Sequence, residues 1–287
     1  MDLPTPMSQA IRPAATVVLV RDGDTGLEVF LLQRSTQSEV MPGAYVFPGG
    51  KLDDADMQAD TQEHLDQSPA QLRAILGERD LDMPTASGLY VAALRETYEE
   101  CGVLFARGGR GARALLERNQ AVPFDRFMAD GTLRLQTRQL LPWSRWITPD
   151  NPAMASKRFD TRFFLAALPR GQRALHDNNE TTASLWIAPR AALAQYWSGQ
   201  LLLAPPQIMS LAHLARHSTV NSAVHEALSR RAPRVLPEMF LEGGERHICF
   251  PGDPRHSEPV RALPGPTQAA YRNQRFEPPG GFEALFV

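Results

Sequence analysis

Short apolar and β-branched runs, separated by turn residues, predict a β-hairpin near the start of the chain. The first run covers residues 14–20 (AATVVLV) and the second covers residues 28–33 (EVFLLQ). Asp22-Gly23-Asp24 stands between them as a turn signal, so we expect the two runs to pair as strands. A third short strand is predicted over residues 44–47, and it ends where Pro48-Gly49-Gly50 requires a tight turn.

The middle of the chain changes character twice. Between Leu52 and Ser87 acidic residues and glutamine are frequent, and this segment looks like an insertion with a short helix over 69–77 and a loop over 80–87. From residue 88 onward, apolar side chains recur at a spacing of three and four residues, at positions 91, 94, 98 and 101. This stripe predicts a helix, and Gly102 is the residue expected to end it.

The second half of the chain has strand patterns followed by helix patterns. We expect strands over 133–146, over 159–167 and up to residues 186–187. Helices are predicted over 189–197, 206–217 and 220–231. After Pro233 we expect one hairpin around Gly243-Gly244 and then a poorly specified tail. This order of strands and helices favours an α+β or α/β sandwich over a barrel or a bundle.

The composition is that of a soluble globular protein. Hydrophobic residues make up 43% of the 287 residues, and 30 basic residues face 32 acidic ones, for a net charge of -2. That balance gives no electrostatic footprint for nucleic acid or for an anionic membrane surface. Cys101 and Cys249 are the two cysteines. They exclude a disulfide framework and fit a reducing compartment, and a disulfide between them is not favoured.

The sequence also shows no recognisable targeting signal. Residues 1–13 contain no apolar run preceded by basic residues, which would mark a signal peptide. No stretch approaches the roughly 18 apolar residues that span a bilayer. The last residues, Leu285-Phe286-Val287, do not match a peroxisomal signal. We therefore expect a cytoplasmic protein with no membrane partner.

Three glutamates carry the chemistry. Glu96, Glu99 and Glu100 stand at positions i, i+3 and i+4, so on a helix they share one face. Like charges at this spacing repel one another unless a divalent cation gathers them as hard oxygen ligands. Arg95 lies four residues before Glu99 and could brace the cluster. The alternative is a solvated acidic face paired with arginines.

The surrounding residues resemble the signature of the Nudix hydrolases. Its second half is present as residues 95–103 (RETYEECGV), with Thr97 in place of the usual apolar residue. Its first half is Gly50 followed six residues later by Asp56, where the family usually has glutamate. The acidic segment separates the two halves by far more than the usual seven residues.

The coenzyme A diphosphatase branch of this family includes members with an insertion at the same place. Its upstream motif resembles residues 31–35 (LLQRS), Gly43 and residues 47–50 (FPGG), with Glu39 where the branch has arginine. Further matches extend the resemblance over residues 11–254, namely Trp143, Trp146, Thr148-Pro149, Arg158-Phe159-Asp160-Thr161, Pro205-Pro206 and Pro251-Gly252-Asp253.

The resemblance implies an α/β/α sandwich with a mixed sheet. A Nudix domain is expected over 11–200, with the insertion at 57–87 inside the Nudix box. Residues 201–287 would add helices and a tail packed on the same domain. The insertion could form a lid or a dimer surface, and a homodimer is left open.

The resemblance also implies roles for particular residues. Glu96 and Arg95 are the catalytic candidates, Glu96 as acceptor of the water proton and Arg95 as orienter of the carboxylates. The metal, Mg²⁺ or Mn²⁺, would be bound by Glu96, Glu99, Glu100, the carbonyl of Gly49 and Glu180. Substrate contacts are expected from Arg34, Ser35, Phe47 and Gly50.

Some of these roles have a plain alternative. Glu180 precedes Trp186 by six residues, as in many Nudix enzymes, but it could equally be a solvated loop carboxylate; Asp177 is a weaker candidate. His213 and His217 have the i, i+4 spacing of a metal pair. Without a third ligand beside them in the sequence, a surface or core pair is favoured.

The expected reaction is hydrolysis of coenzyme A or acyl-coenzyme A to phosphopantetheine and adenosine 3',5'-bisphosphate. A second hypothesis keeps the chemistry and changes the substrate to a nucleotide sugar, a dinucleotide or an oxidised nucleotide. A third, less favoured because all three glutamates are present, is a non-catalytic ligand-binding Nudix module.

Overall fold

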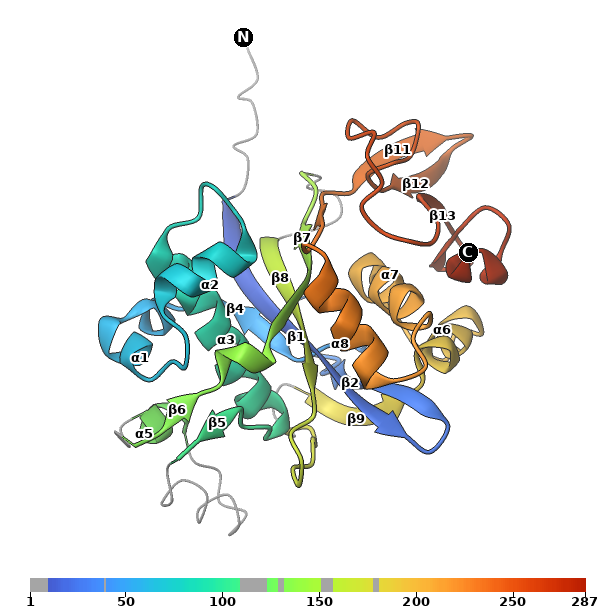
Figure 1. The fold of residues 1–287 in the computed structure, drawn as a ribbon. Helices are drawn as coiled ribbons and strands as arrows, with labels where there is room; N and C mark the ends of the chain where they lie inside the picture. Colours follow the sequence, from blue (N-terminus) through green and yellow to red (C-terminus); the bar gives the residue numbers. More distant parts are fainter. Residues whose placement is uncertain (1–9, 39, 109–122, 129–131, 151–156, 178–180) are drawn as a thin grey trace.

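A computed structural model of the chain describes residues 10–38, 40–108, 123–128, 132–150, 157–177 and 181–287. In this part of the chain, an eight-stranded sheet with parallel and antiparallel pairs lies between two groups of helices (Figure 1). The strands are β1 (Ile11–Gly23), β2 (Gly26–Arg34), β3 (Tyr45–Val46), β4 (Gly49–Lys51), β7 (Leu141–Ile147), β8 (Arg158–Ala167), β9 (Thr181–Ile187) and β10 (Arg234–Val235). The sandwich expected from the sequence is confirmed.

The central path of the sheet runs β10-β7-β8-β1-β2-β3, with β4 paired to β1 and β9 paired to β2. On one face lie α1 (Ala59–Glu63), α2 (Pro69–Leu76) and α3 (Met83–Cys101). On the other lie α6 (Pro189–Trp197), α7 (Pro205–Leu214) and α8 (Val220–Ser229). The sheet therefore has a hydrophobic core on each side.

Strand β1 shows why the sequence is continuously apolar there. Val18 and Val20 belong to the core on the α6–α8 side, whereas Val17 and Leu19 belong to the core under α3. A strand covered on both faces needs apolar residues at every position. The hairpin with β2 is confirmed, with pairs from Val20 and Val29 down to the turn.

Two local predictions were wrong around the third helix. Within the loop expected over 80–87, residues 83–87 instead begin α3, because Asp82 accepts a hydrogen bond from Thr85 N at 2.7 Å as an N-cap. Pro84 sits in the first turn, where its missing N–H costs nothing. The glycines after Pro48 were expected to form only a tight turn, but they belong to β4, which pairs antiparallel with β1.

Ion pairs between charged side chains join the insertion to the sheet. Glu78, between α2 and α3, accepts hydrogen bonds from Arg162 Nε at 3.1 Å and Nη2 at 2.5 Å. Arg145 Nη1 lies 2.9 Å from the same carboxylate, and both arginines also contact Asp160. Arg162 is only 5% exposed. This network joins the residues before α3 to β7 and β8.

Other segments refine the expected pattern. The strand expected over 133–146 divides into β6 (Arg134–Leu135), a short 3-10 turn, η2 (Thr137–Gln139), and β7. β6 pairs with β5 (Ala106–Arg107), and α5 (Phe124–Met128) lies nearby in the sequence. The helices expected from Pro189 to residue 231 are confirmed within a few residues at each end.

The tail is well ordered, which corrects the expectation from its composition. A four-stranded antiparallel sheet contains β11 (Glu238–Glu242), β12 (Glu245–Cys249), β13 (Gln268–Arg272) and β14 (Arg275–Glu277), followed by η3 (Phe282–Phe286). The hairpin at Gly243-Gly244 is confirmed. The second hairpin was missed because its turn residues, Asn273 and Gln274, take a positive φ without glycine.

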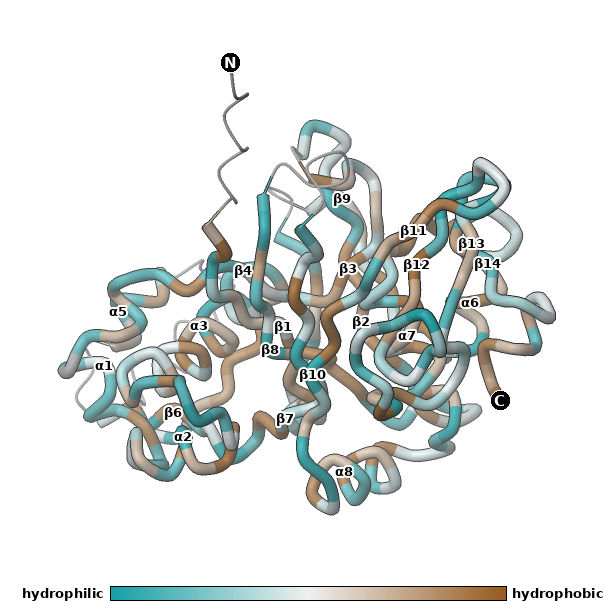
Figure 2. The backbone as a smooth tube through the Cα atoms, turned by 90° about the horizontal axis from the view of Figure 1, so that it is seen from above, coloured by the Kyte–Doolittle hydropathy of each residue, from teal (hydrophilic) through white to brown (hydrophobic). Residues whose placement is uncertain are grey.

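The tail packs against the α6–α8 side of the molecule, as seen from above in Figure 2. Ile248, Phe250 and Leu285 join the same buried cluster as Val18 and Leu211. Residues 201–287 thus share a core with the main sheet. The domain boundary at residue 200 stays a prediction. In the described part of the chain, no helix is long and apolar enough to cross a membrane.

Candidate active site

Helix α3 places the glutamates on its outer face. Its inner face carries Val91, Leu94 and Tyr98, all buried against the sheet. The helix ends at Gly102, whose φ of 70° closes the last turn with a bond to Tyr98 O. Thr97 is fully buried, and its hydroxyl donates to Ala93 O at 2.6 Å. The polar substitution at this position is therefore satisfied within the helix.

Arg95 is the organising side chain of the site. Its Nη1 donates to Glu96 Oε1 at 2.8 Å and to Glu99 Oε2 at 3.1 Å. Its other nitrogens grip both oxygens of Asp56 at 2.9 Å, and Nη2 also reaches Lys51 O at 3.2 Å. Burial alone would lower the pKa of Arg95, but the contacts with Asp56 and Glu96 outweigh it and raise that pKa. The guanidinium stays charged and holds two glutamates in place.

Asp56 has its own support. It belongs to the 3-10 turn η1 (Asp54–Met57), and its second oxygen accepts a bond from Asp53 N at 2.9 Å. Asp56 is 2% exposed. The chain departs into the insertion just after this turn and returns as α3. The long separation in sequence is thereby compatible with a direct ion pair to Arg95.

Two glycines allow strand β4 to approach the helix. Gly49 N donates to Glu100 Oε2 at 2.8 Å. A Cβ on Gly49 would overlap the backbone of Ala15 and Thr16 in β1, and its φ is +155°. A Cβ on Gly50 would lie 2.5 Å from Glu96 Cδ. Glycine at position 49 is thus required by the approach of β4 to β1, and at position 50 the missing Cβ leaves the space that the Glu96 carboxylate occupies.

The three glutamates differ in environment. Glu99 is the exposed member, whereas Glu96 and Glu100 are half-buried. Burial raises the pKa of Glu96; Arg95 opposes this, and the charges of Glu99 and Asp56 add to it. A half-buried carboxylate with a raised pKa is suited to accept a proton.

The residues fit a divalent cation by their donor chemistry. Three carboxylates on one helix face, beside a glycine that leaves room for Glu96, form the all-oxygen set that hard cations prefer. Within the described residues, however, the glutamates are not gathered around one point, because Arg95 holds Glu96 and Glu99 while Gly49 holds Glu100.

The predicted substrate residues lie in two settings. Arg34, at the end of β2, donates to Ser38 Oγ at 2.8 and 3.1 Å. Ser35 Oγ accepts a bond from Gln37 N at 3.2 Å. These contacts shape the loop after β2 and leave a substrate role as a hypothesis.

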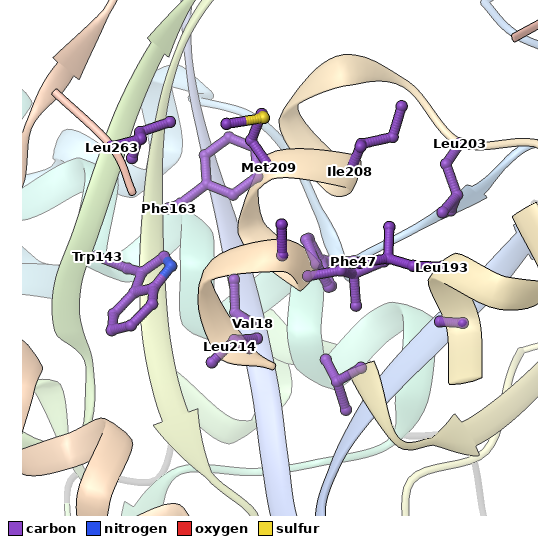
Figure 3. Close-up of a cluster of buried hydrophobic side chains, with 14 of the residues drawn as sticks. Val18, Phe47, Trp143, Phe163, Leu193, Leu203, Ile208, Met209, Leu214 and Leu263 are labelled. Carbon is purple, nitrogen blue, oxygen red and sulfur yellow. The ribbon is translucent and has the colours of Figure 1, made fainter. Parts of the chain in front are cut away.

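Phe47, a predicted substrate contact, lies in the apolar core. Its ring is 2% exposed and packs edge-on against Phe163 at 6.3 Å, within the cluster that contains Val18 and Leu193 (Figure 3). Apolar packing explains the burial of this residue, and its contact with substrate stays a prediction.

Glu180 and Glu39 lie outside the described residues. Asp177 accepts bonds from Thr181 N and Oγ1 at 3.2 and 2.7 Å, so it caps the start of β9. Both cysteines are free and buried. Sequence reasoning missed one convergence, since Glu226 of α8 lies against His213 and His217. No spacing rule links it to that pair.

Comparisons with known proteins agree with this geometry. A family model described as the NUDT19 Nudix domain matches residues 11–214. The chain is 33% identical to the acyl-coenzyme A diphosphatase NUDT19 of Gallus gallus, over 82% of this chain and 74% of that one. It is 29% identical to the human protein of the same name, over 81% and 73%. A crystal structure of a Nudix hydrolase from Alicyclobacillus acidocaldarius covers 78% of this chain and 98% of its own, with a TM-score of 0.60 and 28% identity.

Proposed function

The chain belongs to the Nudix hydrolases, and from this membership we propose that it hydrolyses the diphosphate linkage of acyl-coenzyme A or coenzyme A. The products would be the phosphopantetheine part and adenosine 3',5'-bisphosphate. The observation that carries the proposal is the network of Arg95, which joins Asp56 to Glu96 and Glu99. The names of the chicken and human relatives support the choice of substrate.

Hydrolysis first requires that the negative charge of the diphosphate be neutralised. A diphosphate repels nucleophiles, and a divalent cation, when bound, offsets that charge and activates water. We propose Mg²⁺ or Mn²⁺, because Glu96, Glu99 and Glu100 offer oxygen alone. The carbonyl of Gly49 and the carboxylate of Glu180 are proposed as further ligands.

The protein side chains divide the remaining work. Glu96 is proposed to accept the proton of the attacking water, since it is half-buried and its pKa is raised. Arg95 keeps Glu96 and Glu99 oriented from behind. Arg34, Ser35 and Gly50 are proposed to contact the substrate. The cytoplasmic location and the homodimer expected from the sequence stay predictions.

A substrate panel tests the proposal. Purified protein is incubated with coenzyme A, an acyl-coenzyme A, a nucleotide sugar, a dinucleoside polyphosphate and an oxidised nucleotide, each with Mg²⁺ or Mn²⁺. The products are separated by chromatography: adenosine 3',5'-bisphosphate from the coenzyme A compounds, and the corresponding nucleotides from the other substrates. Turnover of the two coenzyme A compounds above the others supports the proposal. Preference for another diphosphate would contradict the proposed substrate but would still support diphosphate hydrolysis.

A pair of variants separates an enzyme from a binding module. Glu100→Gln removes one candidate ligand while keeping its size, and Glu63→Gln alters an exposed glutamate of α1. The enzyme hypothesis requires turnover that Glu100→Gln abolishes and Glu63→Gln retains. Absence of turnover on every substrate with either metal would contradict it.

A further inference from the structure

A second cluster of metal-binding side chains lies on the opposite face of the sheet from α3. His213 is near the end of α7, His217 follows three residues beyond that helix, and Glu226 is on α8. His213 Nε2 lies 2.6 Å from Glu226 Oε1, and His217 Nε2 lies 2.9 Å from Glu226 Oε2. One ligand atom from each residue falls within 4.8 Å of the others.

The two histidine side chains of the cluster are buried, Glu226 is partly exposed, and some of the polar atoms make no hydrogen bond. The two histidine side chains are 5% and 8% exposed. Among the described residues, three buried nitrogens here make no hydrogen bond: His213 Nδ1, Arg230 Nη2, and His217 Nε2, whose 2.9 Å contact with Glu226 Oε2 is an ion-pair distance without hydrogen-bond geometry. Buried polar atoms are normally paired, and an exception calls for an ion, a water or another ligand. Of these atoms only His217 Nε2 both faces Glu226 and can bind a metal, and it is the one that points to a missing ligand.

We propose that His213, His217 and Glu226 bind a Zn²⁺ ion. Two imidazole nitrogens and one carboxylate are a zinc-binding set with three protein ligands, which leaves a fourth position for water. This set differs in kind from the all-oxygen set on α3, where Mg²⁺ or Mn²⁺ is expected. The two sites therefore select different metals.

The surroundings hold two of the ligands in place. His217 Nδ1 lies 2.8 Å from Ser222 Oγ, a contact that fixes the ring while its Nε2 faces Glu226. The ring of His213 packs against Trp143 with centroids 4.5 Å apart, and Trp143 is itself part of the core in Figure 3. These contacts fix the two rings, and Glu226 must separate from His213 Nε2, now 2.6 Å away, for an ion to lie between them.

Arg230 is the charged neighbour that opposes a cation. Its Nε donates to Glu226 Oε1 at 2.8 Å, and its guanidinium lies 4.5 Å from the centre of the Trp143 ring. It holds the carboxylate between α7 and α8. Without a metal, the same residues would form an ion-pair cluster of histidine, glutamate and arginine. Metal binding and this ion-pair cluster make different predictions.

Zinc binding by the full chain decides between them. The protein is stripped with a chelator and titrated with Zn²⁺ in excess Mg²⁺, which competes for the α3 site. We expect about one tightly bound Zn²⁺ per chain by equilibrium dialysis. His217→Gln and Glu226→Gln should each weaken binding at least about tenfold. His225→Ala, an exposed histidine of α8, is the matched control and should bind as the native protein does.

Two further readouts guard against a folding artefact. Zn²⁺ should raise the Tm of the native chain and of His225→Ala, but not that of Glu226→Gln, whose amide keeps the size of the carboxylate. Glu100→Gln should retain this zinc while losing turnover, which separates the two sites. Equal zinc binding by the native chain, Glu226→Gln and His217→Gln would overturn the proposal, as would its absence from the native chain.

Discussion

The guanidinium of Arg95 binds both carboxylate oxygens of Asp56 at 2.9 Å across 39 residues of sequence. An insertion separates the two residues along the chain, yet the pair closes as a bidentate contact. Because Arg95 also holds Glu96 and Glu99, Asp56 sets the position of two glutamates that it does not touch.

Asp56→Asn tests that relationship. Arg95 keeps Glu96 and Glu99 beside it, so the loss of the charged contacts with Asp56 should cost about 2 kcal/mol. We expect a lower free energy of unfolding by urea denaturation, and a lower kcat at temperatures where the variant is folded. Asp54→Asn, in the same turn but exposed, is the control and should change neither. A loss of stability with unchanged kcat would show that Asp56 does not position the glutamates.

Glu99→Gln and Glu100→Gln test the proposed ligands. A bound cation contributes several kcal/mol to the transition state, and each 1.4 kcal/mol is a factor of ten. We expect kcat to fall by at least about 100-fold in either variant. Glu99 is exposed, so its substitution should leave the Tm unchanged. Normal kcat at saturating Mg²⁺ in both variants would show that Glu99 and Glu100 are not ligands of the catalytic metal.

The chemistry-bearing helix could be predicted from the sequence because two patterns coincide there. The apolar stripe ending at Tyr98 and Cys101 defines the buried face, and the glutamates occupy the opposite one. Its beginning could not be found from the stripe alone. Asp82 and Pro84 mark the start of the helix by local capping. This signal was overlooked because the segment around them was interpreted from its composition.

Other parts of the site depend on tertiary contacts that no spacing rule contains. Phe47 stands in the predicted motif at residues 47–50 (FPGG), but its position in the sequence does not say that it faces the α6–α8 core. Glu226 meets His213 and His217 only because two helices cross there. The sequence showed Asp56 as a displaced carboxylate. Its ion pair with Arg95 could be found only from the structure.

Gly50→Ala tests the close approach of β4 to α3. The added methyl group would overlap the Glu96 carboxylate, so Glu96 must move away from its place beside Arg95. Overpacking of this kind costs about 1–3 kcal/mol, and we expect kcat to fall more than stability explains. Gly199→Ala gives the contrast, since its φ is +80° and nothing lies within 4 Å of the added Cβ. It should lose about 1 kcal/mol from backbone strain and keep its kcat. Equal kcat in the two variants would contradict the proposed role of Gly50.

Glu78→Gln tests the anchor of the insertion. Arg162 is 5% exposed and donates to Glu78 at 2.5 and 3.1 Å, so the substitution removes one of the two carboxylates beside a buried guanidinium and leaves Asp160 in place. We expect a loss of about 2 kcal/mol in the free energy of unfolding, measured by urea denaturation. Arg138→Gln breaks the exposed pair with Asp66 and should cost less than about 1 kcal/mol, because solvent screens such pairs. Because Glu78 does not touch the glutamates of α3, kcat per folded molecule should stay near the native value. A stable Glu78→Gln variant with reduced kcat would instead make the insertion part of the catalytic machinery.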